Sequence, residues 1–279
     1  MSYRALLVHV EAGDASSEAR VCLAASFARR FDAAVIGVAA QAVRPPPVNA
    51  FGAAALMGAA MVAEEEQINA DLQAAERAFR SHAALEGLRT EWRSGVDMPA
   101  MVLVRESRSA DIVIIGQARD GISADPYLAP NPGKVIMAAG WPVLIVPPGT
   151  DSLSALRVVL AWKDVREARR AAADALPILR AADSVHVIQI APPENAETAT
   201  NRVKDVVRYL ARHDVRAQGD MHTRSRASVA EELVEFARHN SADLIVAGAY
   251  GHARLTEWVF GGVTRDLLRH CPMCCLLSH

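Results

Sequence analysis

The feature that most constrains the fold is an internal repeat, because two halves of the 279-residue chain share one sequence pattern. "SADIVIIGQARDG" begins at Ser109 and "SADLIVAGAYGHA" at Ser241, and both read Ser-Ala-Asp, four aliphatic residues, then glycine. Each half ends in a proline followed by an aliphatic run, "WPVLIVP" or "CPMCCLL". Repetition of this kind indicates two similar structural units. We therefore predict two domains, residues 1–150 and 151–279, joined near "PPGTDSLS".

Within each half, short aliphatic runs alternate with amphipathic helical patterns. Continuous apolar strands that alternate with helices are typical of a parallel sheet covered on both faces. Right-handed crossovers then give an open, doubly wound α/β sheet whose ligand crevice lies at the carboxyl ends of the strands. We predict five strands per half, which in the second half are Arg157–Ala161, Ser184–Ala191, Arg216–Thr223, Leu244–Ala247 and Met273–Leu277.

The composition narrows the class of protein. Half of the residues (51%) are hydrophobic and the net charge is −2, so nothing favours nucleic acid or an anionic membrane as a partner. No apolar run reaches the roughly 18 to 20 residues that span a bilayer. The N-terminus lacks a signal-peptide pattern, and four cysteines do not make a disulfide scaffold. We expect a cytoplasmic protein.

Glycines cluster after the fourth predicted strand of the second half. Gly248 and Gly251 follow that strand, and Gly261 and Gly262 precede a predicted helix that begins "VTRDLL". Backbone N–H groups at a helix start form an anion site, to which the Thr264 hydroxyl could contribute. The residues leave a second interpretation open, in which these glycines serve packing alone.

The pattern Gly-x-x-Gly, nine residues, Gly-Gly-Val-Thr and a final X-Pro strand resembles the universal stress protein family. The resemblance covers nearly the whole chain and implies two tandem domains of the adenine nucleotide α-hydrolase type. It further implies that ATP, or another adenine nucleotide, with or without Mg²⁺, binds the second half. The backbone of Ile190 would then face adenine. The residues implied around the phosphates and ribose are Gly248, Gly251, Gly261, Gly262, Val263 and Thr264.

Two departures from the family pattern concern the same site. Gly262 stands where the family usually has Ser or Thr, and loss of one hydroxyl contact to phosphate costs roughly 1.5–3 kcal/mol. Lys163 stands where binders often have Asp, with Asp164 one residue later. Asp164 could take over that role, or Lys163 could reach phosphate. Alternatively the two form a solvated pair in which Asp164 caps the next helix.

The first half carries a weaker version of the motif. Arg119 occupies the position of the second glycine, and Gly133 lies further along and is followed by Lys134. Glu11 ends the first strand at the position that would face adenine. A bulky arginine where backbone should approach phosphate argues against the same binding mode. We therefore predict a degenerate half that stabilises the assembly.

Three other features have competing interpretations. The segment Val43–Gln67 is either a helix lead-in packed on its own domain or an interaction surface. Cys271 and Cys274 suggest a metal or redox site, completed by His270 and His279, but without a second Cys-x-x-Cys pair buried cysteine is the favoured interpretation. His252 could protonate a leaving group beside a phosphate, although a polar loop residue is favoured.

The sequence therefore predicts a nucleotide-responsive regulatory module of the stress response. The alternatives are a nucleotide-free interaction protein and a slow ATPase. No catalytic or metal-ligating residue is predicted, because the sequence has no nucleophile-elbow motif and no evident general base or metal carboxylate, so an enzyme is the less favoured class. By the same resemblance, the terminal strands should pair within one chain as a pseudo-dimer, and the chain should form a homodimer.

Overall fold

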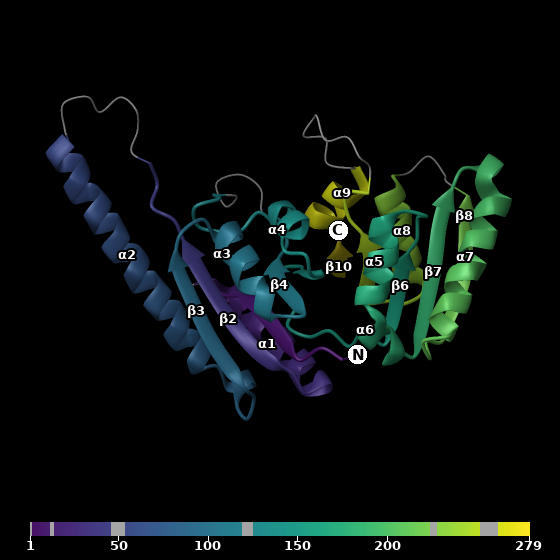
Figure 1. The fold of residues 1–279 in the computed structure, drawn as a ribbon, viewed down its shortest axis with the longest axis horizontal. Coiled ribbons are helices and arrows are strands. Elements are labelled where there is room, and N and C mark those ends of the chain that lie inside the picture. Colours follow the sequence, from purple (N-terminus) through teal and green to yellow (C-terminus); the bar gives the residue numbers. More distant parts are fainter. Residues whose placement is uncertain (1, 12–13, 46–53, 119–124, 224–227, 252–261) are drawn as a thin grey trace.

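The computed structural model describes residues 2–11, 14–45, 54–118, 125–223, 228–251 and 262–279 (Figure 1). Ten strands form one sheet in these residues. They are β1 (Ala5–His9), β2 (Ala34–Gln41), β3 (Thr90–Val96), β4 (Ile112–Gly116), β5 (Val143–Val146), β6 (Arg157–Ala161), β7 (Ser184–Ala191), β8 (Ala217–Thr223), β9 (Leu244–Gly248) and β10 (Cys274–Ser278).

Helices connect these strands in both halves. The α-helices are α1 (Ala15–Phe31), α2 (Ala54–Arg80), α3 (Pro99–Glu106), α4 (Pro132–Ala138), α5 (Arg166–Asp174), α6 (Leu176–Arg180), α7 (Ala196–Ala211), α8 (Val229–His239) and α9 (Gly262–His270). Short 3₁₀ turns are η1 (Ala83–Leu85), η2 (Ser107–Ser109) and η4 (Pro193–Asn195). Side-chain caps begin several of the helices: Asp14 accepts a hydrogen bond from the Ser16 N–H, and Ser228 forms a capping box with Glu231.

The strand order, β3-β2-β1-β4-β5-β10-β9-β6-β7-β8, confirms the predicted doubly wound architecture. Each half contributes five parallel strands in one order, third-second-first-fourth-fifth. The halves meet where β5 and β10 pair antiparallel, with Leu144 opposite Leu276. The last strands of the two halves therefore join two five-stranded units into a single continuous sheet.

The predicted strand bounds of the second half agree with the structure to within one residue. β6 and β7 have the predicted bounds. β8 begins at Ala217 instead of Arg216, β9 extends to Gly248, and β10 is shifted by one residue. The shift of β10 arises because its pairing with β9 begins at Cys274, opposite Leu244.

Both faces of the sheet are covered, which explains the continuous aliphatic runs. Side chains alternate between the faces, so Leu6 packs in one core cluster and its neighbour Leu7 in the other. The first cluster includes residues of α1, α2, α5, α6 and α7, and the second includes residues of α3, α4, α8 and α9. Each half therefore supplies helices to both faces.

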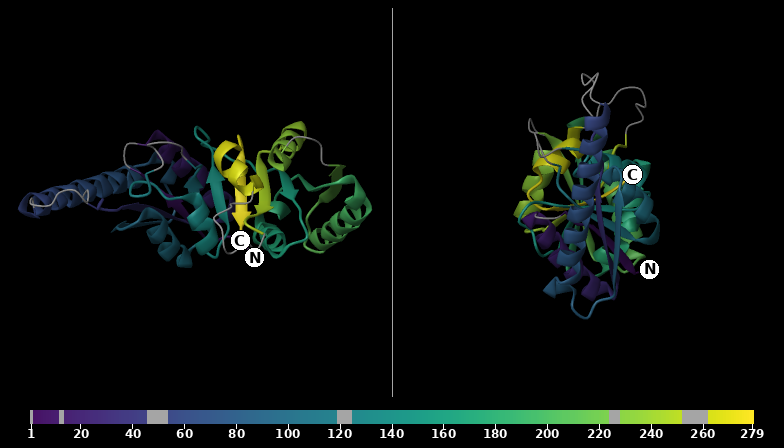
Figure 2. Two further views of the ribbon diagram at one scale, coloured as in Figure 1. Left: turned by 90° about the horizontal axis from the view of Figure 1, so that it is seen from above. Right: turned by 90° about the vertical axis from the view of Figure 1, so that its left-hand side faces the viewer.

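The segment Val43–Gln67 and the residues that follow it differ in how far they pack on the domain. Residues 46–53 lie outside the described residues. The first turns of α2 project beyond the edge of the sheet, with Met61 and Val62 exposed (Figures 1 and 2). Ile68 is buried, because from there α2 packs on the sheet. The interpretation as a lead-in packed on its own domain is therefore wrong for the start of α2, while an interaction surface stays a prediction.

Candidate functional site

The candidate site lies at the carboxyl edge of the sheet in the second half. From β6 the chain continues through α5 to β7 on one side, whereas β9 lies on the other side of β6. In open α/β sheets this reversal of winding creates the crevice in which ligands bind. Residues after β6, the turn after β9, and the start of α9 therefore meet near one point of the sheet edge (Figure 1).

Gly248 ends β9 directly against the first turn of α5. A Cβ built on Gly248 would lie 2.5 Å from the backbone nitrogen of Ala168 and 2.6 Å from the carbonyl carbon of Glu167. Backbone atoms of a helix cannot move aside as a side chain can. Glycine at this position therefore has a structural reason, the close packing of α5 on β9.

Gly251 faces the side chain of Glu167. A Cβ on Gly251 would lie 2.9 Å from Glu167 Oε2 and 3.1 Å from Val165 Cγ2. Glu167 is 7% exposed, and its other oxygen, Oε1, is 3.0 Å from Nη2 of Arg166. A buried carboxylate therefore lies against the glycine turn that the sequence predicts to face phosphate.

The start of α9 combines an open position with a buried one. Among the described residues, no atom outside the backbone of α9 and the neighbours of Gly262 in the chain lies within 4 Å of a Cβ built on Gly262, and Val263 is exposed. Thr264 is buried, and its hydroxyl oxygen accepts a hydrogen bond from the Tyr250 N–H at 3.4 Å. The hydroxyl therefore ties α9 to the glycine turn, while the first N–H groups of the helix stay at the surface.

Lys163 and Asp164, which follow β6, are both exposed. Asp164 forms an ion pair with Arg169 and lies 3.6 Å from Nε of Arg202. The N-cap of α5 is Val165, without a side-chain hydrogen bond. The interpretation of Asp164 as the helix cap is therefore wrong, because α5 begins one residue later and Asp164 pairs with arginines instead.

The backbone of Ile190 lies beyond the end of β6. Trp162 donates its N–H to the Ile188 carbonyl at 2.7 Å, beyond the last paired residues of β6 and β7, Ala161 and Ile188. Residues two apart on a strand direct their backbone groups to the same side. The N–H and C=O of Ile190 therefore face the crevice side, as an adenine-binding backbone requires.

Two predicted site residues, Gly261 and His252, lie outside the described residues. Arg119 of the first half does as well. The structure therefore brings together Gly248, Gly251, Gly262, Val263, Thr264, Ile190, Lys163 and Asp164 at one edge of the sheet, with the first turn of α5 among them.

The corresponding position of the first half contains a buried arginine. A Cβ on Gly116, at the end of β4, would lie 2.9 Å from Nη1 of Arg20. Arg20 is 3% exposed and donates to Ser17 Oγ at 2.7 Å and Ser16 Oγ at 2.9 Å. Asp14 lies 3.4 Å from the same guanidinium. Arg20 therefore lies against Gly116 as the backbone of α5 lies against Gly248.

The sequence reasoning missed both Arg20 and Glu167. Each lies on the first helix of its half, on the face that carries buried alanines: Ala24 is four residues after Arg20, and Ala171 is four residues after Glu167. A charged residue in the apolar stripe of an amphipathic helix is the signal that could have identified them.

The other first-half residues of the motif lie as follows. Gly133 is buried within α4 and Lys134 is exposed. Glu11 is half-buried, and its N–H donates to Ser17.

The cysteines of the last strand are buried. Cys271, Cys274 and Cys275 are at most 2% exposed. Burial raises the pKa of the Cys274 thiol to about 12, which disfavours the thiolate that metals and redox chemistry need. In the part of the chain that the structure describes, no three His, Cys, Asp or Glu residues gather as a metal site. The same residues contain no helix with the length and apolarity of a membrane span.

Comparisons with known proteins agree on one family. The model of the universal stress protein family matches residues 2–147 and again residues 154–279. A universal stress protein from Archaeoglobus fulgidus DSM 4304 has a similar structure, with a TM-score of 0.71 and 14% identity, over 98% of this chain and 95% of its own. A functionally unknown protein from Pseudomonas aeruginosa PAO1 gives 0.61 and 16%, over 99% and 92%.

At such identities the similar structures show the fold alone. No curated protein matches this chain. The family model, however, matches both halves and together nearly the whole chain. The chain belongs to the universal stress protein family.

Proposed function

We propose that this protein is a nucleotide-responsive regulatory module that binds ATP, or another adenine nucleotide, at the carboxyl edge of the second half. The observation that carries the proposal is the start of α9. The N–H groups of a helix N-terminus attract phosphate, and no side chain of the described residues lies within 4 Å of a Cβ built on Gly262. Ile190 provides backbone groups across the crevice for adenine, in the manner that the family resemblance implies.

Glu167 determines how such a ligand binds. Its carboxylate lies against Gly251, and a phosphate beside it would meet a like charge. Nucleotide binding therefore requires Glu167 to rotate toward solvent, which it can do at the first turn of α5 with its partner Arg166, an exposed residue. Such a movement would change the surface around α5 and α9, and this is the regulatory change that we propose.

Isothermal titration calorimetry with ATP tests the proposal. We expect Glu167→Gln to bind ATP at least about tenfold more tightly than the wild type, because a like charge is removed from the phosphate site. We expect Gly262→Asp to abolish binding. Glu194→Gln, which removes an exposed acid from η4, is the control and should leave the affinity unchanged. No heat of binding in wild type and Glu167→Gln alike would overturn the proposal.

A second candidate function, a nucleotide-free interaction protein, is favoured by one observation. Glu167 already fills the face of Gly251 in the structure, as a protein that has lost its ligand would require. The exposed apolar residues at the start of α2, Met61 and Val62, would then belong to a partner surface. The calorimetric experiment separates the two candidates, because this one predicts no binding by either protein.

We further propose that the two halves act as an intramolecular pseudo-dimer. The antiparallel pair β5–β10 supports this arrangement, with Val143 opposite Leu277. Val143→Pro removes a backbone donor and should separate the halves in limited proteolysis. Halves that stay docked would contradict the proposal. The homodimer stays a prediction, which light scattering of the purified protein tests.

A further inference from the structure

Helix α2 of the first half is longer than its counterpart in the second half. α2 and α7 each connect the second and third strands of their half, but α2 has 27 residues and α7 has 16. The buried residues of both helices have the same spacing along the chain. These residues are Ile68, Leu72, Ala75 and Phe79 of α2, and Ala199, Val203, Val206 and Leu210 of α7. When the two sets are aligned, α7 begins opposite Glu65, so residues 54–64 of α2 have no counterpart.

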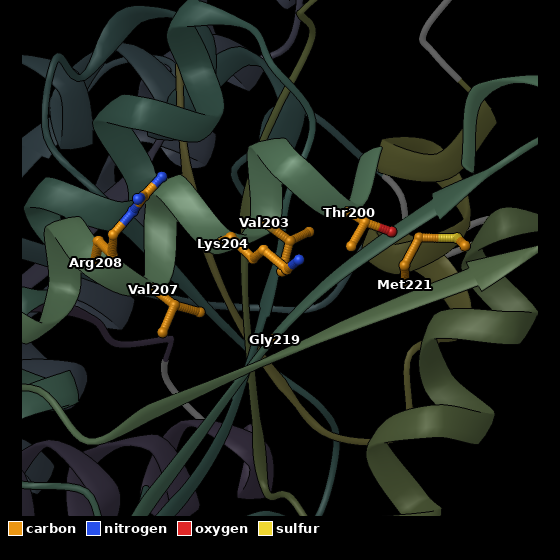
Figure 3. A pocket seen from close by; sticks show the side chains of 7 residues that line it. All are labelled: Thr200, Val203, Lys204, Val207, Arg208, Gly219 and Met221. Carbon is orange, nitrogen blue, oxygen red and sulfur yellow. The ribbon is translucent and has the colours of Figure 1, made fainter. Parts of the chain in front are cut away.

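A helix as long as α7 already covers the edge strand of its half. Val203 and Val207 of α7 lie against Gly219 of β8, with methyl carbons 2.6 and 3.3 Å from a Cβ built on that glycine (Figure 3). β8 has 7 residues and spans about 23 Å, and the 16 residues of α7 span about 24 Å. β3, the edge strand of the first half, also has 7 residues. Residues 54–64 of α2, which we call the extension, therefore add about 16 Å of helix that the sheet does not need.

The extension is exposed on all sides. Residues 58–63 are small or apolar, and each of them is exposed although together they complete more than one turn of helix. Met61 is 44% exposed and Val62 is 57% exposed. Helices that are apolar all round are ordinarily buried, and helices in proteins gain most of their stability from packing. The extension therefore has the composition of a helix that packs on another surface.

Contacts at its base hold the extension beyond the edge of the sheet (Figures 1 and 2). The backbone N–H of Arg44 donates to Glu64 Oε1 at 3.2 Å, and Nη2 of Arg44 is 2.6 Å from Asp125 Oδ2. From Ile68 onward, α2 packs on the sheet. The start of α2 is therefore presented in one direction, away from the sheet, where a second molecule can reach it.

We propose that the extension pairs antiparallel with the extension of a second copy of this chain, around a twofold axis. Gly58 and Met61 are three positions apart and lie on one face of the helix. Among the described residues, no atom outside the backbone of α2 and the neighbours of Gly58 in the chain lies within 4 Å of a Cβ built on Gly58. The Met61 side chain of each copy packs over the partner's Gly58. One segment thus carries both a projection and the gap that receives it, as twofold pairing requires.

Charge favours the antiparallel direction. Glu65 and Glu66 are exposed, and among the described residues neither has an ion-pair partner. With Met61 opposite the partner's Gly58, Glu65 lies opposite the partner's Ala54, the first residue of α2. The positive end of the helix dipole there attracts the carboxylate. A parallel pair would instead place the two Glu65 carboxylates side by side, where they repel. The pairing does not depend on the nucleotide proposal.

Sedimentation velocity of the full chain, over a range of concentrations, tests the pairing. A contact between two short helical segments buries less than about 1,200 Å², so we expect a dissociation constant on the order of 10 to 100 µM. Met61→Glu should raise this constant at least about tenfold, because pairing would bury an unpaired charge. Met101→Glu makes the same change at an exposed methionine of α3, and this control should leave the constant unchanged.

A second pair of variants tests the direction. Glu65→Lys should raise the dissociation constant about fivefold, because a cation would meet the positive end of the partner's helix. Glu86→Lys makes the same charge change at an exposed acid outside α2 and should not alter the constant. Equal constants for these two variants would overturn the antiparallel arrangement.

Three other results would overturn the pairing itself. The first is a chain that stays monomeric at every concentration. The second is a dimer that Met61→Glu leaves intact, because the two copies would then meet through another surface. The third is a monomeric chain that binds phosphatidylcholine vesicles and loses this binding in Met61→Glu, because the extension would then pack on lipid.

Discussion

The two halves of the sheet share one strand order but differ in what they bury at equivalent places. Gly116, at the end of β4, faces the guanidinium of Arg20, whereas its counterpart Gly248, at the end of β9, lies against the backbone of Glu167 and Ala168. The Glu167 carboxylate lies against Gly251, three residues further on. Both charged residues belong to the first helix of their half. At the outer edge, Trp92 of β3 packs on Phe79, whereas Val203 of α7 lies against Gly219, the equivalent position of β8.

This difference shows that the residues that build the sheet and the residues that surround the candidate site are determined separately. The sheet needs small residues where a helix crosses a strand end, and both halves supply glycine there. In the first half a side chain, that of Arg20, approaches this glycine, whereas in the second half the backbone of α5 does. In the first half, Arg20 lies against Gly116 and is held there by Ser16, Ser17 and Asp14. The second half holds a single carboxylate beside an exposed arginine.

The largest expected effect concerns the glycines at the two strand ends. Gly248→Ala should destabilise the protein by about 3 kcal/mol, because the new methyl group strikes the backbone of α5. Gly116→Ala should cost about 1 kcal/mol, since it meets the end of the Arg20 side chain, which can shift by a few tenths of an ångström. Guanidinium chloride unfolding measures both. Equal losses would contradict the account of why Gly248 is glycine.

The next effect concerns the outer edge. Trp92→Ala should cost about 2 kcal/mol, because a half-buried indole that packs on Phe79 is lost and a cavity is created. Added indole should recover part of this stability in the variant and none in the wild type. Thermal unfolding with and without indole measures the recovery, and its absence would show that neighbouring side chains close the space that the indole leaves.

A smaller effect is expected for Arg20, the buried arginine of the first half. Arg20→Met should cost roughly 1 to 2 kcal/mol, because the partly buried Asp14 loses its cation while keeping its bond from the Ser16 N–H. Urea unfolding at pH 7 measures the loss. An unchanged free energy of unfolding would show that Arg20 and its contact with Asp14 contribute no net stability.

The smallest effect concerns Asp174, a second acid on α5. Burial raises the pKa of its carboxyl above the usual value, with Arg170 acting in the opposite direction. A raised pKa in the folded state means that ionisation costs stability, so the protein loses stability as the pH rises through that pKa. Asp174→Asn should therefore stabilise the protein at pH 7 by less than about 1 kcal/mol, and by nothing below about pH 3. A destabilised variant at pH 7 would reverse this sign.

The fold could be predicted from the sequence because each of its elements has a local signature. Aliphatic runs such as Arg157–Ala161 and Ser184–Ala191 identify buried parallel strands, and the repeat identifies the two units. The place of the candidate site in the fold could be predicted from the sequence, but the side chains that line it could not. An acid in the first turn of a helix, such as Glu167, ordinarily faces water beside the helix dipole. Its burial against Gly251 depends on how α5 crosses β9, which no local pattern records.

The same limit applies to other residues. The sequence predicts that the Thr264 hydroxyl faces phosphate. In the fold, however, the glycine turn lies close to the start of α9, and the hydroxyl accepts a hydrogen bond from the Tyr250 N–H instead. Asp164 reads as a helix cap, yet arginines from α5 and α7 are its partners. That Gly219 is the counterpart of Trp92 follows only from the strand registers of both halves, which no local pattern records.

The central claim is that nucleotide binds one half of this protein and not the other. An ATP titration of the ¹⁵N-labelled protein, followed by NMR, tests this claim most directly. We predict shifts at the amides of Ile190, Gly251 and Gly262, with none at Gly116. Equal shifts at Gly116, or unchanged spectra at saturating ATP for both wild type and Glu167→Gln, would contradict the claim.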